Sequence, residues 1–284
     1  MRRALGVLAI SLLALLGVTG LSAPAGADGV PLPTNPFGEP TGANDWSCQP
    51  SAQRPEPVII VHGTFGDRKS LLDDLSAAMV AEGFCVFSLD YGNRGTGDIA
   101  TSAKQLKRFT AKVLDATGAA KVSMVGHSQG GMMPRYYIKF LGGASVVDDL
   151  VGLSPSNHGT TVAGDQSNPL TGGFCTSCNQ QAAGSDFLTR LNAGDETPGS
   201  VSYTQISTRY DEVVVPYTSA FLAAGQRTTN VTIQDSCPGD TAEHVFIPMS
   251  RTAIAWVLDA LTRPGPADPS FQPECSATGL PGAP

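Results

Sequence analysis

Short β-branched runs alternate with segments of helical periodicity along this chain, and the alternation restricts the fold more than any other feature. Val58-Ile59-Ile60-Val61, between Pro57 and Gly63, is typical of a strand that is buried on both faces. The pattern predicts strands at 58–61, 84–89, 121–125, 146–153, 201–208 and 231–234, and helices at 69–81, 99–116, 132–140 and 250–261. This order predicts an α/β fold in which a mostly parallel central sheet of about six strands carries helices on both faces.

The first 27 residues are typical of a secretory signal peptide. Met1-Arg2-Arg3 precedes an apolar run at 4–21, and a small-residue stretch follows that ends at Ala25-Gly26-Ala27. An uncleaved membrane anchor is the alternative, but the A-x-A pattern favours cleavage. Because the later apolar runs are short and interrupted, we expect no integral membrane segment in the mature protein. We expect this mature protein to be secreted and extracellular, and to be a monomer.

The rest of the chain suits one catalytic domain at 58–284, preceded by an extended segment at 28–57 that is rich in Pro, Gly and Asn. An irregular insertion at 157–199, helical only at 187–191, is expected near the active site, and a Pro-rich tail occupies 264–284. Loss of the signal peptide with its two arginines would change the formal charge from −7 to −9. Nucleic acid is therefore not an expected partner.

The chain has six cysteines, an even number, which predicts three disulfides in an exported protein. Six cysteines allow fifteen pairings, and their spacing alone selects none. Cys175 and Cys178 have the spacing of a zinc or redox motif, but the chain offers no second CxxC pair and no nearby His, which favours a small loop bridge. We prefer the local set of Cys48–Cys85, Cys175–Cys178 and Cys237–Cys275, in which Cys275 holds the tail.

Gly126-His127-Ser128-Gln129-Gly130 matches the pattern G-x-S-x-G. The pattern is informative only where a strand enters it and a helix leaves it, and the ranges 121–125 and 132–140 supply both. Such a turn exposes the serine hydroxyl at the N-terminus of a helix, where free N–H groups favour developing negative charge. The sequence therefore predicts an α/β-hydrolase fold with Ser128 as the nucleophile, against the alternative of a coincidental Gly-Ser turn.

A serine nucleophile needs a base, normally histidine, and the chain has four. His127 adjoins Ser128, and its side chain should point away from it. His62 precedes the nucleophile, whereas in α/β-hydrolases the order is Ser, acid, His. His158 follows Ser128 too soon to leave room for an acid, and is interpreted as a loop histidine that bonds backbone. His244, between the last strand and the last helix, is the predicted base, with His158 in reserve.

The acid should follow a strand between the nucleophile and the base, so that it can orient the imidazole. Asp211 follows the expected strand at 201–208 and is the predicted acid, against the alternative of a solvated turn carboxylate. Asp235, at the end of the next expected strand, is its main competitor. The other carboxylates in the interval are Asp165, Asp186, Asp195 and Glu243. The spacing of the acidic residues in the insertion does not resemble a calcium loop, and no metal site is expected.

An oxyanion hole requires two backbone N–H groups, one from the residue after the nucleophile and one from a loop after an early strand. Gln129 supplies the first. The loop His62-Gly63-Thr64-Phe65-Gly66 follows the first expected strand, and its glycines allow the amide of Thr64 to face Ser128. The Thr64 hydroxyl is a further candidate donor, and a glycine turn without a role is the alternative.

With these residues assembled, the chain resembles the secreted bacterial class 2 lipases and, more distantly, the fungal lipase B group. The resemblance rests on 61–64, 126–131, 157–160, 208–214 and His244 shortly before the closing helix. It implies lipase or esterase activity without an organic cofactor. In fungal lipase B one disulfide brackets the oxyanion loop and another starts just before the catalytic histidine, which supports the pairs Cys48–Cys85 and Cys237–Cys275. The insertion contains no identifiable helical lid.

The leading hypothesis is hydrolysis of a carboxylic ester or related acyl compound through an acyl-enzyme on Ser128. The resemblance implies that the substrate is a triacylglycerol or another lipid ester, with contact at a lipid–water interface. The triad alone also suits a cutinase-like or polyester hydrolase, an acyltransferase or a serine peptidase, because the same residues serve all of them. From a different class, an inert secreted binding protein on a hydrolase scaffold is the alternative. Acyl chain length and stereochemical preference do not follow from the sequence.

Overall fold

The computed structural model describes residues 38–162 and 175–275, and all of them belong to one compact unit that begins at Pro33. The expected signal peptide at 1–27, the acid candidate Asp165 and the last part of the tail lie outside the described residues.

The described chain contains a six-stranded sheet in the order β2-β1-β3-β4-β5-β6, and every neighbouring pair is parallel. The strands are β1 (Val58–Val61), β2 (Val86–Leu89), β3 (Val122–His127), β4 (Val147–Leu153), β5 (Ser202–Ser207) and β6 (Thr228–Thr232). This confirms the predicted fold class. Because all six strands run in the same direction, the loops that follow them gather at a single edge of the sheet.

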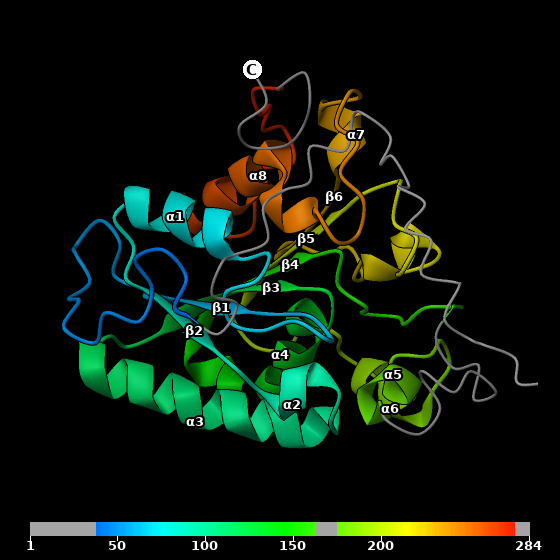
Figure 1. Ribbon diagram of the computed structural model, residues 1–284, viewed down its shortest axis with the longest axis horizontal. Helices are drawn as coiled ribbons and strands as arrows, with labels where there is room; N and C mark the ends of the chain where they lie inside the picture. Colours follow the sequence, from blue (N-terminus) through cyan, green and yellow to red (C-terminus); the bar gives the residue numbers. More distant parts are fainter. Residues whose placement is uncertain (1–37, 163–174, 276–284) are drawn as a thin grey trace, which may run out of the picture. The chain divides into compact units, whose positions relative to one another are not determined.

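Helices cover both faces of the sheet, as Figure 1 shows. The long helices α3 (Ile99–Thr117) and α4 (Gln129–Phe140) lie on one face, and α1 (Asp73–Ala81) and α8 (Arg251–Thr262) lie on the other. Each face has its own apolar cluster, with Ile59 and Val61 directed into one and Val58 and Ile60 into the other, as strand alternation requires. The shorter helices are α2 (Gly92–Gly95), α5 (Thr176–Gln180), α6 (Asp186–Asn192) and α7 (Ile233–Ser236), and 3₁₀ turns occur at Gly143–Ser145, Tyr217–Ala220 and Ile247–Met249.

The largest error in the expected elements lies at the edge strand. A strand was expected at 231–234, but β6 covers Thr228–Thr232 and α7 follows it at once. As an edge strand, β6 pairs only with β5, and its first three residues are polar, so Val231 near its end is its only apolar residue. The short helices α2 and α5 were not expected. α2 holds Asn93 and Arg94 at positive φ, which is not a helical conformation.

Three disulfides join Cys48 to Cys85, Cys175 to Cys178 and Cys237 to Cys275, the same local pairs that were preferred on the sequence. The first ties the N-terminal segment to the start of β2, and the second closes α5. The third ties the end of α7 to the tail. No cysteine is left free. In the portion of the chain that the structure describes, no helix combines the length and the apolar character that crossing a membrane requires.

Candidate active site

Ser128 occupies a strained turn between β3 and α4. Its backbone has φ 55° and ψ −124°, a conformation that a residue with a side chain rarely adopts. The turn is tight enough to require glycine on both sides. A Cβ on Gly126 would lie 1.9 Å from the carbonyl oxygen of Gly130, and one on Gly130 would lie 2.2 Å from that of Val61. Ser128 itself donates its N–H to the carbonyl of Leu153 at 2.8 Å. This is the geometry of a nucleophile elbow.

A buried histidine–carboxylate pair comes from the loops that follow the last two strands. His244 Nδ1 lies 2.9 Å from Asp211 Oδ1 and 3.0 Å from Oδ2. Asp211 Oδ1 also accepts the backbone N–H groups of Val213, at 3.0 Å, and Val214, at 2.7 Å. Burial by itself raises the pKa of Asp211, but the hydrogen bond and charge of His244 and the N–H of Val214 outweigh it and hold the pKa below its usual value. The carboxylate therefore stays ionised and leaves His244 Nε2 as the open nitrogen.

His127 connects the nucleophile elbow to the loop of His244. Its Nε2 lies 2.8 Å from the backbone carbonyl of His244, and the two rings are 5.0 Å apart. Burial, assisted by the charge of His244, lowers the pKa of His127 to about 3, so the ring is neutral and donates this bond. His127 was rejected as the base on the sequence. Nothing in the sequence indicated that its ring would hold the loop of His244.

The loop after β1 lies against Ser128. A Cβ on Gly63 would be 3.0 Å from the Cβ of Ser128, so Thr64 is at the elbow. The Thr64 hydroxyl oxygen accepts Gln129 Nε2 at 2.7 Å and Gln181 Nε2 at 3.0 Å. Gln129 is the first residue of α4, and the first N–H groups of a helix have no partner within it. Thr64 and Gln129 are thus both placed beside Ser128, and Gln181 is a neighbour that the sequence did not point to.

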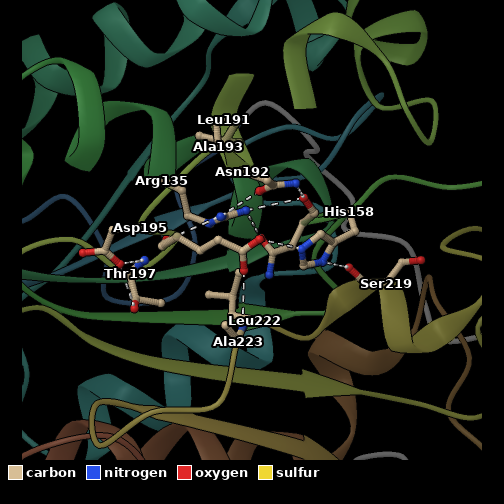
Figure 2. A network of polar contacts seen from close by, with 12 residues as sticks. Arg135, His158, Leu191, Asn192, Ala193, Asp195, Thr197, Ser219, Leu222 and Ala223 are labelled. Carbon is tan, nitrogen blue, oxygen red and sulfur yellow. Dashed lines mark hydrogen bonds and ion pairs between the residues drawn. The ribbon is translucent and has the colours of Figure 1, made fainter. Parts of the chain in front are cut away.

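The remaining histidines lie in other settings. His62 is buried against Tyr91, with ring centroids 4.3 Å apart, and its Nδ1 bonds the carbonyl of Gly63 at 2.7 Å. Burial lowers its pKa. His158 Nε2 lies 2.9 Å from Glu196 Oε1, and its Nδ1 lies 3.3 Å from the carbonyl of Ser219. Arg135 lies beside this second pair, with its Nη2 3.4 Å from the backbone carbonyl of Glu196, and Figure 2 shows His158 and Arg135 in the same network of polar contacts.

Among the described residues, none of the other carboxylate candidates is bonded to the His244 imidazole as Asp211 is. Asp235 forms an exposed ion pair with Arg209. Asp195 accepts the N–H of Thr197, Glu243 accepts the N–H of Val245, and Asp186 lies in the first turn of α6. Across residues 38–162 and 175–275, no three His, Cys, Asp or Glu side chains are grouped as a metal site would need.

The parallel sheet and the nucleophile elbow together define an α/β-hydrolase. The sequence model of the class 2 lipases matches residues 55–253, and the chain belongs to this lipase family.

Similar proteins agree with that assignment. A triacylglycerol lipase of Pseudarthrobacter phenanthrenivorans is 37% identical over 92 residues, which are 28% of this chain and 27% of that protein. One of Vibrio cholerae is 32% identical over 115 residues, covering 39% and 34%. The chain thus matches about a quarter to a third of the length of these relatives.

Solved lipase structures share the fold. Aspergillus fumigatus lipase B superposes with a TM-score of 0.69 at 23% identity, over 82% of this chain and 57% of that one. The mature Bacillus licheniformis lipase BlEst2 superposes with a TM-score of 0.55 at 15% identity, over 69% and 91%.

Proposed function

We propose that this protein is a secreted hydrolase of carboxylic esters, with triacylglycerols or related lipid esters as substrates. The observation that carries the proposal is the buried Asp211–His244 pair, held by His127 against the strained elbow of Ser128. Secretion is supported by the three disulfides, since such bonds persist in oxidising compartments, and by the signal-like sequence at 1–27.

In the proposed mechanism the Ser128 hydroxyl attacks the ester carbonyl while His244 Nε2 accepts its proton. Asp211 holds the imidazole through Nδ1 and stabilises the imidazolium that forms. His244 then returns the proton to the leaving alcohol, which gives an acyl-enzyme on Ser128. Water, activated by the same imidazole, releases the acid and restores the serine.

The charge on the carbonyl oxygen is stabilised by the N–H groups of Gln129 and Thr64. The hydroxyl of Thr64 adds a third donor. Its oxygen already accepts two amide hydrogens, from Gln129 and Gln181, so both lone pairs are occupied and its own hydrogen is left for another acceptor. Loss of one such donor typically costs about 3 kcal/mol of barrier.

The exposed apolar side chains favour a lipid substrate. Among the described residues, six large apolar side chains are exposed, and five of them lie on the loops of the site. Phe65 follows Thr64, Tyr210 and Val213 flank Asp211, Val245 follows His244, and Val162 comes just after Thr160, which bonds the acid loop. Apolar groups gathered at one edge are suited to contact with an apolar phase. This favours a lipid ester at a lipid–water interface as the substrate over an ester that is fully dissolved in water.

The related alternatives use the same residues. A cutinase-like or polyester hydrolase would also need an apolar rim, and an acyltransferase differs only in the acceptor of the acyl group. An inert binding protein is disfavoured, because a buried histidine–carboxylate pair and a strained serine are costly features to keep without chemistry.

Labelling with a fluorophosphonate probe tests the chemistry. Wild type should be labelled, Ser128→Ala should not, and peptide mapping should place the label on Ser128. Failure of the wild type to react would overturn the enzyme assignment. Rates on p-nitrophenyl esters from two to sixteen carbons and on emulsified triolein test the substrate. Turnover of short soluble esters alone would contradict the lipase assignment.

A further inference from the structure

The short helix α5 contacts the candidate oxyanion hole, although it lies more than a hundred residues later in the chain than Thr64. Gln181, just after this helix, donates its Nε2 to the Thr64 hydroxyl at 3.0 Å and accepts the Ser156 hydroxyl on its Oε1 at 2.8 Å. Its backbone carbonyl accepts the N–H of Thr160. Gln181 is buried, and both the nitrogen and the oxygen of its side-chain amide are bonded. The amide is therefore held in one orientation, with its nitrogen toward Thr64.

A second contact from the same helix reaches Gln129. The Ser177 hydroxyl donates to the carbonyl of Gly95 at 2.6 Å, and this carbonyl also accepts Gln129 Nε2 at 2.7 Å. Gly95 packs directly on the oxyanion loop, since a Cβ there would lie 3.2 Å from the Cα of Thr64. The N–H of Ser177 adds a bond to the carbonyl of Thr96. α5 therefore fixes the backbone at Gly95, which packs on Thr64, as well as the Thr64 hydroxyl.

The disulfide closes the turn that carries Ser177. Cys175 and Cys178 bracket that residue, and all three are buried. A helix of five residues is too short to be stable by itself, because helix nucleation is costly. The bridge fixes the first turn of this helix without help from a long apolar face.

We propose that α5, closed by Cys175–Cys178, is a positioning element of the oxyanion hole. Gln181 sets the direction of the Thr64 hydroxyl, and Ser177 sets the Gly95 carbonyl that orients Gln129. Neither residue touches the substrate. The proposal rests on the proposed function, because it assumes an oxyanion at Thr64. Since the oxyanion forms only in the transition state, removal of these contacts should lower kcat and leave KM nearly unchanged.

A double-mutant cycle between Gln181 and Thr64 tests the proposal, with kcat and KM measured on p-nitrophenyl butyrate. Thr64→Val removes the hydroxyl and keeps the backbone N–H. We expect Gln181→Ala to lower kcat about 10-fold in the wild-type background and by less than about twofold in Thr64→Val. An equal loss in both backgrounds, or a loss confined to KM, would overturn the proposal.

Two further variants separate positioning from folding. Gln181→Glu keeps the length and the acceptor for Ser156 but cannot donate to Thr64, so it should lower kcat at least as much as Gln181→Ala. It tests the proposal if Gln181→Ala folds poorly. Gln180→Ala is the matched control, because Gln180 bonds Asp98 and the N–H of Ile99 instead of the oxyanion loop. It should act alike in both Thr64 backgrounds. If Gln180→Ala shows the same coupling to Thr64, the effect is general loosening and the proposal fails.

Removal of the bridge tests the role of the disulfide. The pair Cys175→Ala and Cys178→Ala should lower kcat about 3- to 5-fold at 25 °C, and the loss should shrink in Thr64→Val. The pair Cys237→Ala and Cys275→Ala should lower the melting temperature without this coupling. Equal coupling in both disulfide variants would contradict the assignment. A wild type that hydrolyses no ester and binds no fluorophosphonate would overturn the proposed function and this proposal together, whereas an active wild type without coupling would overturn this proposal alone.

Discussion

The described residues contain two histidine–carboxylate pairs with the same separation but different burial and different partners. His244 and Asp211 are 2.9 Å apart, and so are His158 and Glu196. The first pair is almost completely buried, with side chains 5% and 0% exposed, whereas the second is 38% and 16% exposed. Figure 2 shows His158 of the second pair together with Arg135, Asn192 and Ser219.

The ring nitrogens explain why the pairs differ in chemistry. In His244 the carboxylate takes Nδ1, so Nε2 is the nitrogen left for the proton transfer that we propose. In His158 the carboxylate takes Nε2, and Nδ1 faces the carbonyl of Ser219. Both nitrogens of His158 therefore face acceptors, and no lone pair is offered to a nucleophile. A carboxylate beside an imidazole thus makes a base only when the other nitrogen is left open.

The second pair has a structural task instead. The Arg135 guanidinium, fully buried, donates Nη2 to Asn192 Oδ1 at 2.8 Å and to the carbonyl of Glu196 at 3.4 Å. Burial lowers the pKa of Arg135 to about 10, and Glu196 opposes that change. Glu196 Oε2 also accepts the N–H of Ala223. The carboxylate therefore compensates a buried cation and joins two loops.

The largest expected effect is on turnover. Asp211→Asn should lower kcat about 10⁴-fold, because the amide no longer stabilises the imidazolium and favours the wrong tautomer. Glu196→Gln, the matched change in the other pair, should lower kcat less than about threefold. Steady-state rates on p-nitrophenyl butyrate measure both. A loss of similar size in the two variants would mean that the two pairs are not functionally distinct.

Asp149 is a buried carboxylate without a histidine partner, and its pKa is raised where those of Asp211 and Glu196 are lowered. Burial, with Asp148 nearby, raises the pKa of Asp149 to about 7, although Ser123 donates to it at 3.1 Å. Because the folded pKa exceeds the unfolded one, Asp149 costs nothing below about pH 4, and its cost grows up to about pH 7 and then stays constant. Asp149→Asn should therefore raise the free energy of unfolding by about 1–3 kcal/mol at pH 8. Urea denaturation at pH 4 and pH 8 measures the difference, and an equal gain at both values would contradict this account.

Removal of the charge of Glu196 should lower the free energy of unfolding clearly, although it should change kcat only slightly. Glu196→Gln keeps an acceptor for Ala223 but leaves Arg135 without its carboxylate, so we expect a loss of about 1–2 kcal/mol at pH 7. Urea denaturation measures it. Glu39→Gln, at an exposed ion pair with Arg68, is the control and should change the stability by less than about 0.5 kcal/mol. Equal losses would show that the burial of Arg135 does not matter.

The smallest effect is the pH dependence of that loss. Burial by itself raises the pKa of Glu196, but the hydrogen bond and charge of His158, the N–H of Ala223 and the charge of Arg135 together outweigh it, so the folded pKa lies below its usual value of 4.5. The stability that this carboxylate contributes is present above about pH 4.5 and is lost as the pH falls through the folded pKa. The melting temperatures of wild type and Glu196→Gln should therefore converge between pH 5 and pH 3. A constant difference would mean that the charge is not responsible.

The parts of the site that follow local patterns were predictable. The strand before Ser128, the helix after it and the loop that carries Thr64 lie in segments whose glycines and β-branched runs identify the turn directly. Asp211 was preferred over Asp235 because it follows the expected strand at 201–208, and the structure shows that the two carboxylates have different partners. Asp211 points back to His244, whereas Asp235 pairs with Arg209 at the surface.

The contacts that join distant segments were not predictable. Gln181 and Ser177 carry amide and hydroxyl groups that belong to no motif, and they lie in an insertion without periodicity. His127 was visible in the sequence, but its bond to the carbonyl of His244 spans more than a hundred residues of chain. Both predicted ends of β6 were wrong, because an edge strand needs no apolar run that would mark it in the sequence. Tertiary contacts decided each of these cases.

The nucleophile elbow also limits how this sequence can vary. Gly126 and Gly130 pack so closely against backbone that not even a methyl group fits at either position. Neither residue offers a side chain to a substrate, yet a library of variants selected for activity should retain glycine at both positions as strictly as serine at 128. Engineering of substrate preference therefore has to leave these two positions alone and draw its diversity from the rim, where Phe65, Tyr210 and Val245 have room to change.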